Sequence, residues 1–180
     1  MGNTEDTPER LNRLWAPWRI EYIRQSRELA CVLCTAPARG DDEAALVLHR
    51  GRFNFIIMNA YPYSPGHLMV APYRHTADLD ALSAAEGAEH TELVKASVAL
   101  LRTMAQPDGY NIGLNLGRVA GAGFDQHLHT HIVPRWLGDT NFMPVLADTR
   151  VLSESLAAMY RRLKRTLTED ESLRVRLQPC

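Results

Sequence analysis

Several features are scarce in this sequence of 180 residues, and each scarcity excludes a class of protein. No apolar run approaches the ~18 residues of a membrane-spanning helix, and no apolar stretch follows the N-terminus as in a secretory signal. The formal net charge is only −1, so electrostatics gives no reason to expect binding to nucleic acid or to an acidic membrane. The three cysteines, without an export signal, do not indicate a structural disulfide. We therefore expect a cytoplasmic protein without nucleic-acid or membrane partners.

The sequence does contain enough apolar material for one packed domain. Apolar residues make up 46% of the chain, too many for a disordered protein. Residues 1–8 are small and polar and are expected to be disordered, residues 9–167 to form the domain, and residues 168–180 to form a charged C-terminal tail. An aromatic-rich stretch with Trp15 and Trp18 is expected to pack on the core or on a partner subunit, with base stacking as the alternative.

Periodicity and turn signals predict the order of the elements. Strands are expected over residues 45–49, 53–58, 67–71, 110–117 and 127–133. Helices are expected over 83–104, where Ser83 and Glu86 form a capping box, and over 151–167.

The expected strand over residues 110–117 has two unlike faces. Its apolar side chains, of which Ile112 is typical, alternate with small or polar ones such as Gly113 and Asn115. A strand without bulk on one face leaves space beside the sheet, which a ligand can use. A loop rich in glycine and alanine follows at residues 119–123.

The most informative segment is His127-Leu128-His129-Thr130-His131-Ile132-Val133. In a strand its three histidines share one face, with neighbours about 6.5–7 Å apart. Imidazole is a nucleophile, a proton carrier near neutral pH and a metal ligand, and three imidazoles are costly to bury without partners. The pattern therefore favours phosphorus chemistry, with a three-histidine metal site and a purely structural role as alternatives.

This segment resembles the signature of the histidine-triad (HIT) superfamily, in which histidines alternate with apolar residues. Only Thr130 is less apolar than that pattern asks. The resemblance extends over roughly residues 44–136 and includes the stretches 59–67 and 134–136. It implies an α+β fold, with a mostly antiparallel sheet of about five strands and flanking helices, and a homodimer to which the Trp15 and Trp18 segment contributes.

The flanking stretches 14–19 and 138–142 are similar to a zinc-bearing bacterial branch of the family that includes diadenosine tetraphosphate phosphorylases. The resemblance implies that His129 attacks the α-phosphorus of a nucleotide and forms a nucleotidyl-histidine intermediate, which water, phosphate or another acceptor resolves. His131 would donate hydrogen bonds to the phosphate oxygens. The implied substrates are diadenosine polyphosphates or related adenosine nucleotides, cleaved by phosphorolysis or hydrolysis. A non-catalytic nucleotide-binding protein is the alternative.

Further nucleotide-binding residues are implied by the same resemblance. His67 would line the phosphate pocket, and Asn59 matches a position that contacts ribose; a surface histidine and a turn-forming asparagine are the alternative interpretations. The expected set also includes Asn115, Gly121 and Gly123. Where many members carry Gln followed by Ser or Thr, this sequence has Gly123 and Phe124, so backbone N–H groups would have to contact the phosphates there.

Cys31 and Cys34 have the spacing of a zinc knuckle. A redox pair and two inert thiols are the alternatives. Some zinc-bearing members of the superfamily use two cysteines, a downstream histidine and the first histidine of the triad. By this resemblance the ligands of a structural zinc ion are Cys31, Cys34, His75 and His127.

Overall fold

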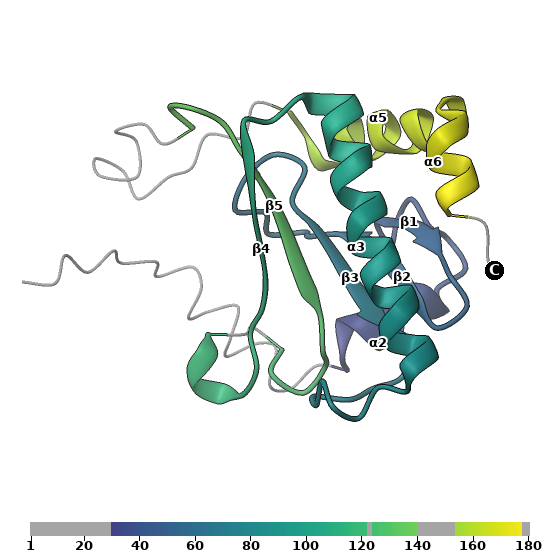
Figure 1. Ribbon diagram of the computed structural model, residues 1–180, viewed down its shortest axis with the longest axis vertical. Coiled ribbons are helices and arrows are strands. Elements are labelled where there is room, and N and C mark those ends of the chain that lie inside the picture. Colours follow the sequence, from purple (N-terminus) through teal and green to yellow (C-terminus); the bar gives the residue numbers. More distant parts are fainter. Residues whose placement is uncertain (1–29, 122–123, 140–153, 178–180) are drawn as a thin grey trace, which may run out of the picture.

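The computed structural model describes residues 30–121, 124–139 and 154–177. Five strands form one antiparallel sheet in the order β1-β2-β3-β5-β4, with the bounds β1 (Val47–Arg50), β2 (Asn54–Met58), β3 (Leu68–Pro72), β4 (Gly109–Leu114) and β5 (Thr130–Arg135). Helices flank the sheet (Figure 1), so the expected α+β fold is confirmed. The predictions made for residues 1–8, Trp15, Trp18 and Gly123 lie outside the described residues.

The two faces of the sheet carry different helices: α3 (Ala84–Ala105), α5 (Leu156–Glu169) and α6 (Glu171–Arg176) lie on one, and α2 (Val32–Ala38) lies on the other (Figure 1). Alternation along the strands builds both cores. Ile56 and Ile132 pack with the first group of helices, on what we call the α3 face. Phe55 and Met69 pack with α2, on the α2 face.

Helix α3 begins where the sequence predicts. The Ser83 hydroxyl accepts a hydrogen bond from the Glu86 amide, and the Glu86 carboxylate accepts one from the Ser83 amide. This capping box satisfies two of the amides that every helix start leaves unpaired. None of the helices in the described ranges is long and apolar enough to cross a membrane.

Strand β5 differs from the expected strand at both ends. It starts at Thr130 rather than at residue 127, and it runs through Pro134 to Arg135. Proline is tolerated there because β3 pairs with β5 only as far as Ile132, so no strand on that side lacks an amide donor. His127 and His129 therefore lie in the irregular segment that leads into β5.

Strand β4 lies at an edge of the sheet, and its apolar face is only partly covered. Helix α3 packs on β2, β3 and β5, so Ile112 on β4 remains 49% exposed. A short 3-10 helix, η1 (Arg118–Ala120), follows β4 in the connection to β5.

The described part of the expected charged tail, residues 168–177, is mostly helical. Helix α5 continues to Glu169, and α6 follows at once. The Asp170 carboxylate caps α6 by accepting hydrogen bonds from the amides of Ser172 and Leu173. The Leu173 side chain is 1% exposed and belongs to the main core. A helix cap at Asp170 and a buried side chain at Leu173 thus stabilise a segment in which the sequence shows mainly charged residues.

Candidate active site and metal site

The histidine site lies on the α2 face, where β3 and β5 pair. His131 on β5 is opposite Met69 of β3 on one side and Gly113 of β4 on the other. Since cross-strand partners point to the same face, Gly113 lies beside the His131 side chain. A methyl group built at Gly113 would meet no atom of the described residues within 4 Å. This is the open space beside the sheet that the alternation of small residues predicts.

Among the described residues, a backbone carbonyl orients the His129 ring. Its Nδ1 lies 2.7 Å from the carbonyl oxygen of His127. A carbonyl only accepts hydrogen bonds, so Nδ1 carries the hydrogen and Nε2 keeps its lone pair. The side chain is only 7% exposed, and burial lowers its pKa, although the bond to the carbonyl opposes this shift. The geometry therefore favours a neutral ring with a nucleophilic Nε2.

His67 and His131 form a second fixed arrangement. The Tyr63 amide donates to Nδ1 of His67 at 3.1 Å, so the hydrogen of His67 is on Nε2. That atom lies 3.0 Å from Nδ1 of His131 and donates to it, which puts the hydrogen of a neutral His131 on Nε2. Burial and the neighbouring rings of His131 and His129 lower the pKa of His67 to about 3. His67 is 1% exposed, so it is not a surface histidine.

The rings of His129 and His131 are close and nearly perpendicular. Their centroids are 4.7 Å apart with an interplanar angle of 76°. His67 follows, with its ring centroid 5.1 Å from that of His131. The structure thus brings His67, His129 and His131 together.

Of the other residues expected to bind nucleotide, Asn59 has a contact with this cluster. The Asn59 amide nitrogen lies 3.4 Å from Nδ1 of His67, while its oxygen accepts from the Tyr61 amide at 2.9 Å and closes the turn. Asn115 is half-buried just after β4. Gly121 ends η1 with a φ of 84°, a conformation that favours glycine.

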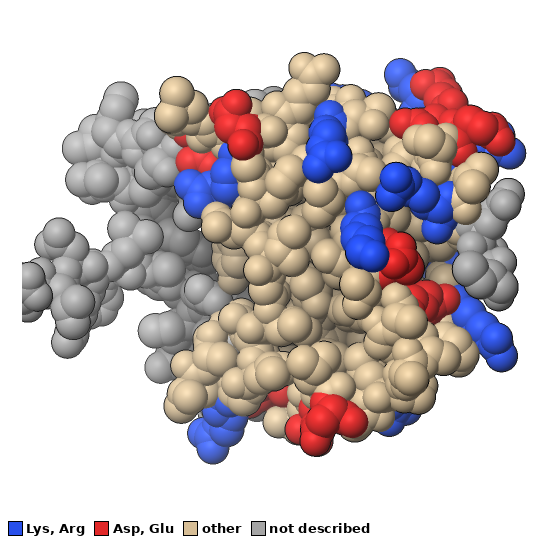
Figure 2. Space-filling view, in the orientation of Figure 1, with Lys and Arg blue, Asp and Glu red and all other residues tan. Residues whose placement is uncertain are grey.

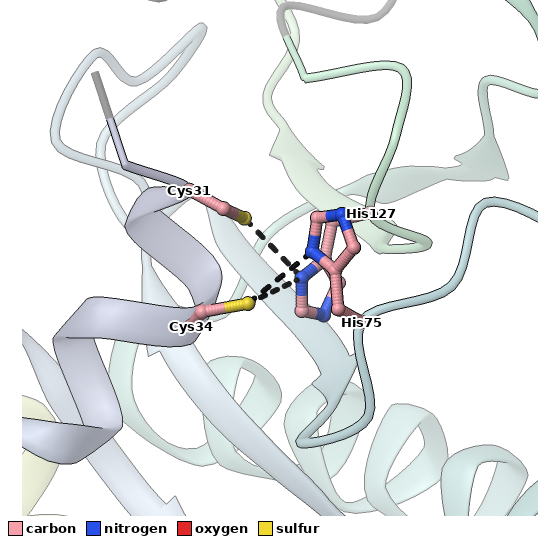
Figure 3. A group of neighbouring side chains, drawn as sticks. All are labelled: Cys31, Cys34, His75 and His127. Atoms are coloured by element: carbon pink, nitrogen blue, oxygen red, sulfur yellow. Dashed lines mark hydrogen bonds between the residues drawn. The ribbon is translucent and has the colours of Figure 1, made fainter.

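The four residues expected to bind zinc converge from three parts of the chain (Figure 3). Their ligand atoms all lie within 4.8 Å of one another. Cys31 Sγ is 3.3 Å from Nδ1 of His127, and Cys34 Sγ is 3.3 Å from Nδ1 of His75 and 3.4 Å from Nδ1 of His127. Sulfur and nitrogen ligands of one tetrahedral zinc ion are ~3.5 Å apart, given the usual bond lengths. The donor set and its spacing therefore fit zinc.

Hydrogen bonding and charge support the same fit. Nε2 of His127 donates to the Pro72 carbonyl at 2.8 Å, which leaves the Nδ1 lone pair directed at the two sulfur atoms. Metal-binding histidines commonly make such a bond with the other ring nitrogen. Burial and the adjacent Cys31 raise the pKa of Cys34 to about 11, and a bound cation is what would reverse that shift.

The metal-ligand cluster found among the described residues includes His127 but neither His129 nor His131. This arrangement gives no support to a metal ion held by all three histidines of the triad. It also assigns different surroundings to the three: His127 faces sulfur, whereas His129 and His131 face each other.

Two backbone groups set the tautomers of histidines in these sites, and the residue types in the sequence do not reveal them. The Tyr63 amide and the Pro72 carbonyl set the tautomers of His67 and His127, and every non-proline residue carries an amide and every residue a carbonyl. The only sequence signal nearby is the turn-rich stretch that ends at Gly66, which folds residue 63 back toward His67.

Comparison with known proteins agrees with the geometry. The family model described as HIT domain matches residues 41–136. A protein named AP-4-A phosphorylase from Mycobacterium tuberculosis is 37% identical over 157 residues, which cover 82% of this chain and 80% of the relative. A protein named Bis(5'-adenosyl)-triphosphatase from Saccharomyces cerevisiae is 28% identical over 91 residues, covering 50% of this chain and 44% of that one. Among solved structures, a Zn-bound histidine triad family protein from Mycobacterium smegmatis superposes with a TM-score of 0.62 at 23% identity, covering 79% and 96% of the two chains.

Proposed function

Because this chain belongs to the HIT-domain family, we propose that it is an enzyme that cleaves diadenosine polyphosphates at an α-phosphate through His129. The observation that carries the proposal is the state of the His129 ring. Its Nδ1–H bond to the His127 carbonyl leaves the Nε2 lone pair as the nucleophile, and burial keeps the ring neutral by lowering its pKa.

The reaction proceeds in two displacements at the same phosphorus atom. Nε2 of His129 attacks, an N–P bond forms, and the bond from that phosphorus to the bridging oxygen of the leaving group breaks. An oxygen of the acceptor then attacks the phosphorus and loses its proton to solvent, the N–P bond breaks, and His129 regains its lone pair. The Nε2–H of His131 donates to the phosphoryl oxygens as negative charge grows on them.

The named activities of the relatives support the substrate class. The relative that covers most of this chain is named for phosphorolysis of AP-4-A, and a second is named for cleavage of a diadenosine triphosphate. We favour inorganic phosphate as the acceptor on the strength of the first. Phosphorolysis of diadenosine tetraphosphate gives ADP and ATP, whereas hydrolysis at the α-phosphorus gives AMP and ATP.

The test is to incubate the purified protein with diadenosine tetraphosphate, with and without inorganic phosphate, and to separate the nucleotides. ADP and ATP formed only with phosphate would establish a phosphorylase, and AMP formed without phosphate a hydrolase. The His129→Ala variant should lose roughly 10⁴-fold or more of the rate. Tight AMP binding without turnover would instead identify a non-catalytic nucleotide-binding protein.

Covalent catalysis has its own test. A slowly cleaved adenylyl substrate mixed with the protein should leave an AMP adduct on His129, which mass spectrometry of the intact chain and of its peptides can locate. The absence of any adduct during active turnover would reject the nucleotidyl-histidine intermediate.

We also propose that Cys31, Cys34, His75 and His127 bind one structural zinc ion. The ion supplies rigidity: it joins α2 to the loop after β3 and to the segment that leads into β5. The Nε2–H bond from His127 to the Pro72 carbonyl orients that ligand ring. The carbonyl of His127, which accepts from His129, then has a fixed position.

The protein is further proposed to be a cytoplasmic homodimer without nucleic-acid or membrane partners. Reduced cysteines suit zinc binding in the cytoplasm. Lys and Arg are mixed with Asp and Glu around the rim of the face in Figure 2, and a central area over the middle of β4 and α3 shows no charged side chain. Ile112 and Leu116, at this edge of the sheet, are 49% and 46% exposed, which suits contact with a second copy.

A further inference from the structure

A chain of buried polar side chains connects α3 to the histidine segment from the opposite side of the sheet. Thr130, the residue that departs from the apolar family pattern, is 4% exposed and points to the α3 face. Its hydroxyl oxygen lies 2.7 Å from Nε2 of His90, a residue of α3 that is 7% exposed. Nδ1 of His90 lies 3.0 Å from Oδ1 of Asn54, which is 0% exposed.

The direction of each bond follows from the partners of Asn54. Its amide nitrogen donates to the Glu86 carbonyl at 3.1 Å and to the Glu89 carboxylate at 2.9 Å. Oδ1 therefore faces His90 and accepts from its Nδ1–H. A neutral His90 then has only a lone pair at Nε2, so the Thr130 hydroxyl donates to it. Burial lowers the pKa of His90 against the opposing effect of Glu89, in agreement with a neutral ring.

Glu89 anchors the far end of this chain of bonds. Its carboxylate accepts from the amides of Arg52, Phe53 and Asn54 at 2.6, 2.7 and 2.8 Å. The turn before β2, helix α3 and strand β5 are thereby tied together by side chains. Every buried side-chain nitrogen or oxygen in the described ranges has a partner, so the loss of one member leaves another unsatisfied at a low dielectric.

Thr130 occupies a sensitive position in the candidate active site. It is the first residue of β5, paired with Val70 of β3 and Leu114 of β4. His129 precedes it in the irregular segment and His131 follows it in the strand. Any shift of the backbone at Thr130 therefore changes the relative position of the proposed nucleophile and of the group that donates to the phosphate.

We propose that His90 is a positioning residue of the reaction, which holds Thr130, and with it His129 and His131, in the attacking geometry. The expected effect of His90 on the reaction rate rests on the proposed function, whereas its expected effect on the positions of His129 and His131 does not. Threonine suits position 130 because its hydroxyl donates a hydrogen bond, and histidine suits position 90 because its Nε2 accepts that bond while its Nδ1–H donates to Asn54. An apolar residue at position 130 would pack there, but without the hydrogen bond to His90 the position of β5 relative to α3 would be less well defined.

The test compares Thr130→Val and Thr130→Ser with Ser97→Ala. Valine keeps the shape and removes the hydroxyl, whereas serine keeps the hydroxyl. Ser97 is the matched control, because its buried hydroxyl on the same helix bonds only to the Leu93 carbonyl, at 2.8 Å. We expect kcat for diadenosine tetraphosphate to fall roughly 10- to 100-fold in Thr130→Val with KM little changed, and to stay within about twofold of the parent in Thr130→Ser and Ser97→Ala.

A second readout does not depend on turnover. In ¹⁵N-histidine NMR spectra, His90 should show the Nδ1–H tautomer with Nε2 as acceptor, and Thr130→Val should shift the His129 ring signals while Ser97→Ala leaves them in place. If the parent protein turns over, an unchanged kcat in Thr130→Val overturns the inference. If the parent does not turn over, the proposed function fails, and unchanged His129 signals in Thr130→Val then overturn this inference separately. Thr130→Ala replaces Thr130→Val should the latter not fold.

Discussion

The histidines of this protein differ in burial, and burial decides when each ring can carry a proton. His67 and His129 are 1% and 7% exposed, and a charged imidazole loses its hydration there. His75, among the zinc-binding candidates, is exposed. The fold therefore keeps His67 and His129 neutral, so His129, the proposed nucleophile, can attack without first losing a proton.

The rate should consequently persist into mildly acidic solution. Since burial lowers the pKa of His129 from the ordinary value of 6.5, the ring stays unprotonated as the pH falls through 6.5 and is protonated only further down. We expect the acid limb of kcat/KM to lie below pH 6.5, measured as initial rates of diadenosine tetraphosphate cleavage from about pH 4 to 8. A limb at or above pH 6.5 would contradict a neutral, buried nucleophile.

The same burial predicts a pH-dependent stability. The pKa of His67 falls from 6.5 to about 3 on folding, so between these values the unfolded chain binds a proton that the folded chain does not. The contribution of the neutral His67 ring to the free energy of unfolding is fully present above pH 6.5 and is lost progressively as the pH falls toward 3. It is on the order of a few kcal/mol.

The measurement is the free energy of unfolding by denaturant across that range for the parent and for His67→Asn. Any loss of the proposed zinc ion at low pH affects both proteins, so the difference between their slopes isolates the contribution of His67. A variant whose stability falls as steeply as that of the parent would show that His67 is protonated in the folded protein.

At the scale of whole elements, the sequence predicts features that depend on neighbouring residues better than features that depend on contacts between distant segments. The start of α3 and the β1–β2 hairpin follow from a capping box and from turn residues close in sequence. The continuation of β5 through Pro134 and the folding of α6 depend on which strand or core residue lies opposite, and neither Pro134 nor Leu173 gives a local sign of it. In the site, residue types and the family resemblance identified the histidines and cysteines. The Asn54–His90–Thr130 connection could not be read in advance because it joins three separate elements.

Helix α2 is the element that most needs external support. It has seven residues, contains Pro37 and lacks a side-chain cap at its start, and so short a helix is not stable by itself. Only Leu33 and Ala36 of the helix are buried in the core beneath it. In the proposed zinc site, Cys31 and Cys34 would anchor both the start and the first turn of this helix.

We expect Cys31→Ser to lose the metal and to lower the melting temperature by more than about 5 °C. The parent should carry about one zinc ion per chain by elemental analysis. Thr35→Ala, which changes an exposed hydroxyl of the same helix bonded only to the Val32 carbonyl, should keep both the metal and the stability. Zinc retained by Cys31→Ser but lost by His129→Ala would place the metal at the triad instead.

At the scale of the molecule, the two edges of the sheet are protected unequally. Helix α5 covers the β1 edge: the Tyr160 hydroxyl donates to the Val47 carbonyl at 3.0 Å, and the Lys164 ammonium donates to the Leu48 carbonyl at 2.9 Å. The β4 edge has no comparable cover among the described residues, and it exposes Ile112. An exposed edge with apolar side chains is a site where another chain adds.

We therefore expect the protein to be a dimer in solution and Ile112→Lys to be a monomer, as measured by light scattering coupled to size-exclusion chromatography. A stable interface buries on the order of 1,000 Å² or more, and a lysine at its centre would place an unpaired charge in that area. Val175→Lys is the matched control, since Val175 is 59% exposed but lies on α6 rather than at the β4 edge. It should remain a dimer. A monomeric parent, or a dimer disrupted by Val175→Lys and not by Ile112→Lys, would show that the β4 edge is not the interface. If the β4 edge is the interface, Gly113 and the adjoining His131 lie next to it, so the monomeric variant should also show a higher KM for diadenosine tetraphosphate.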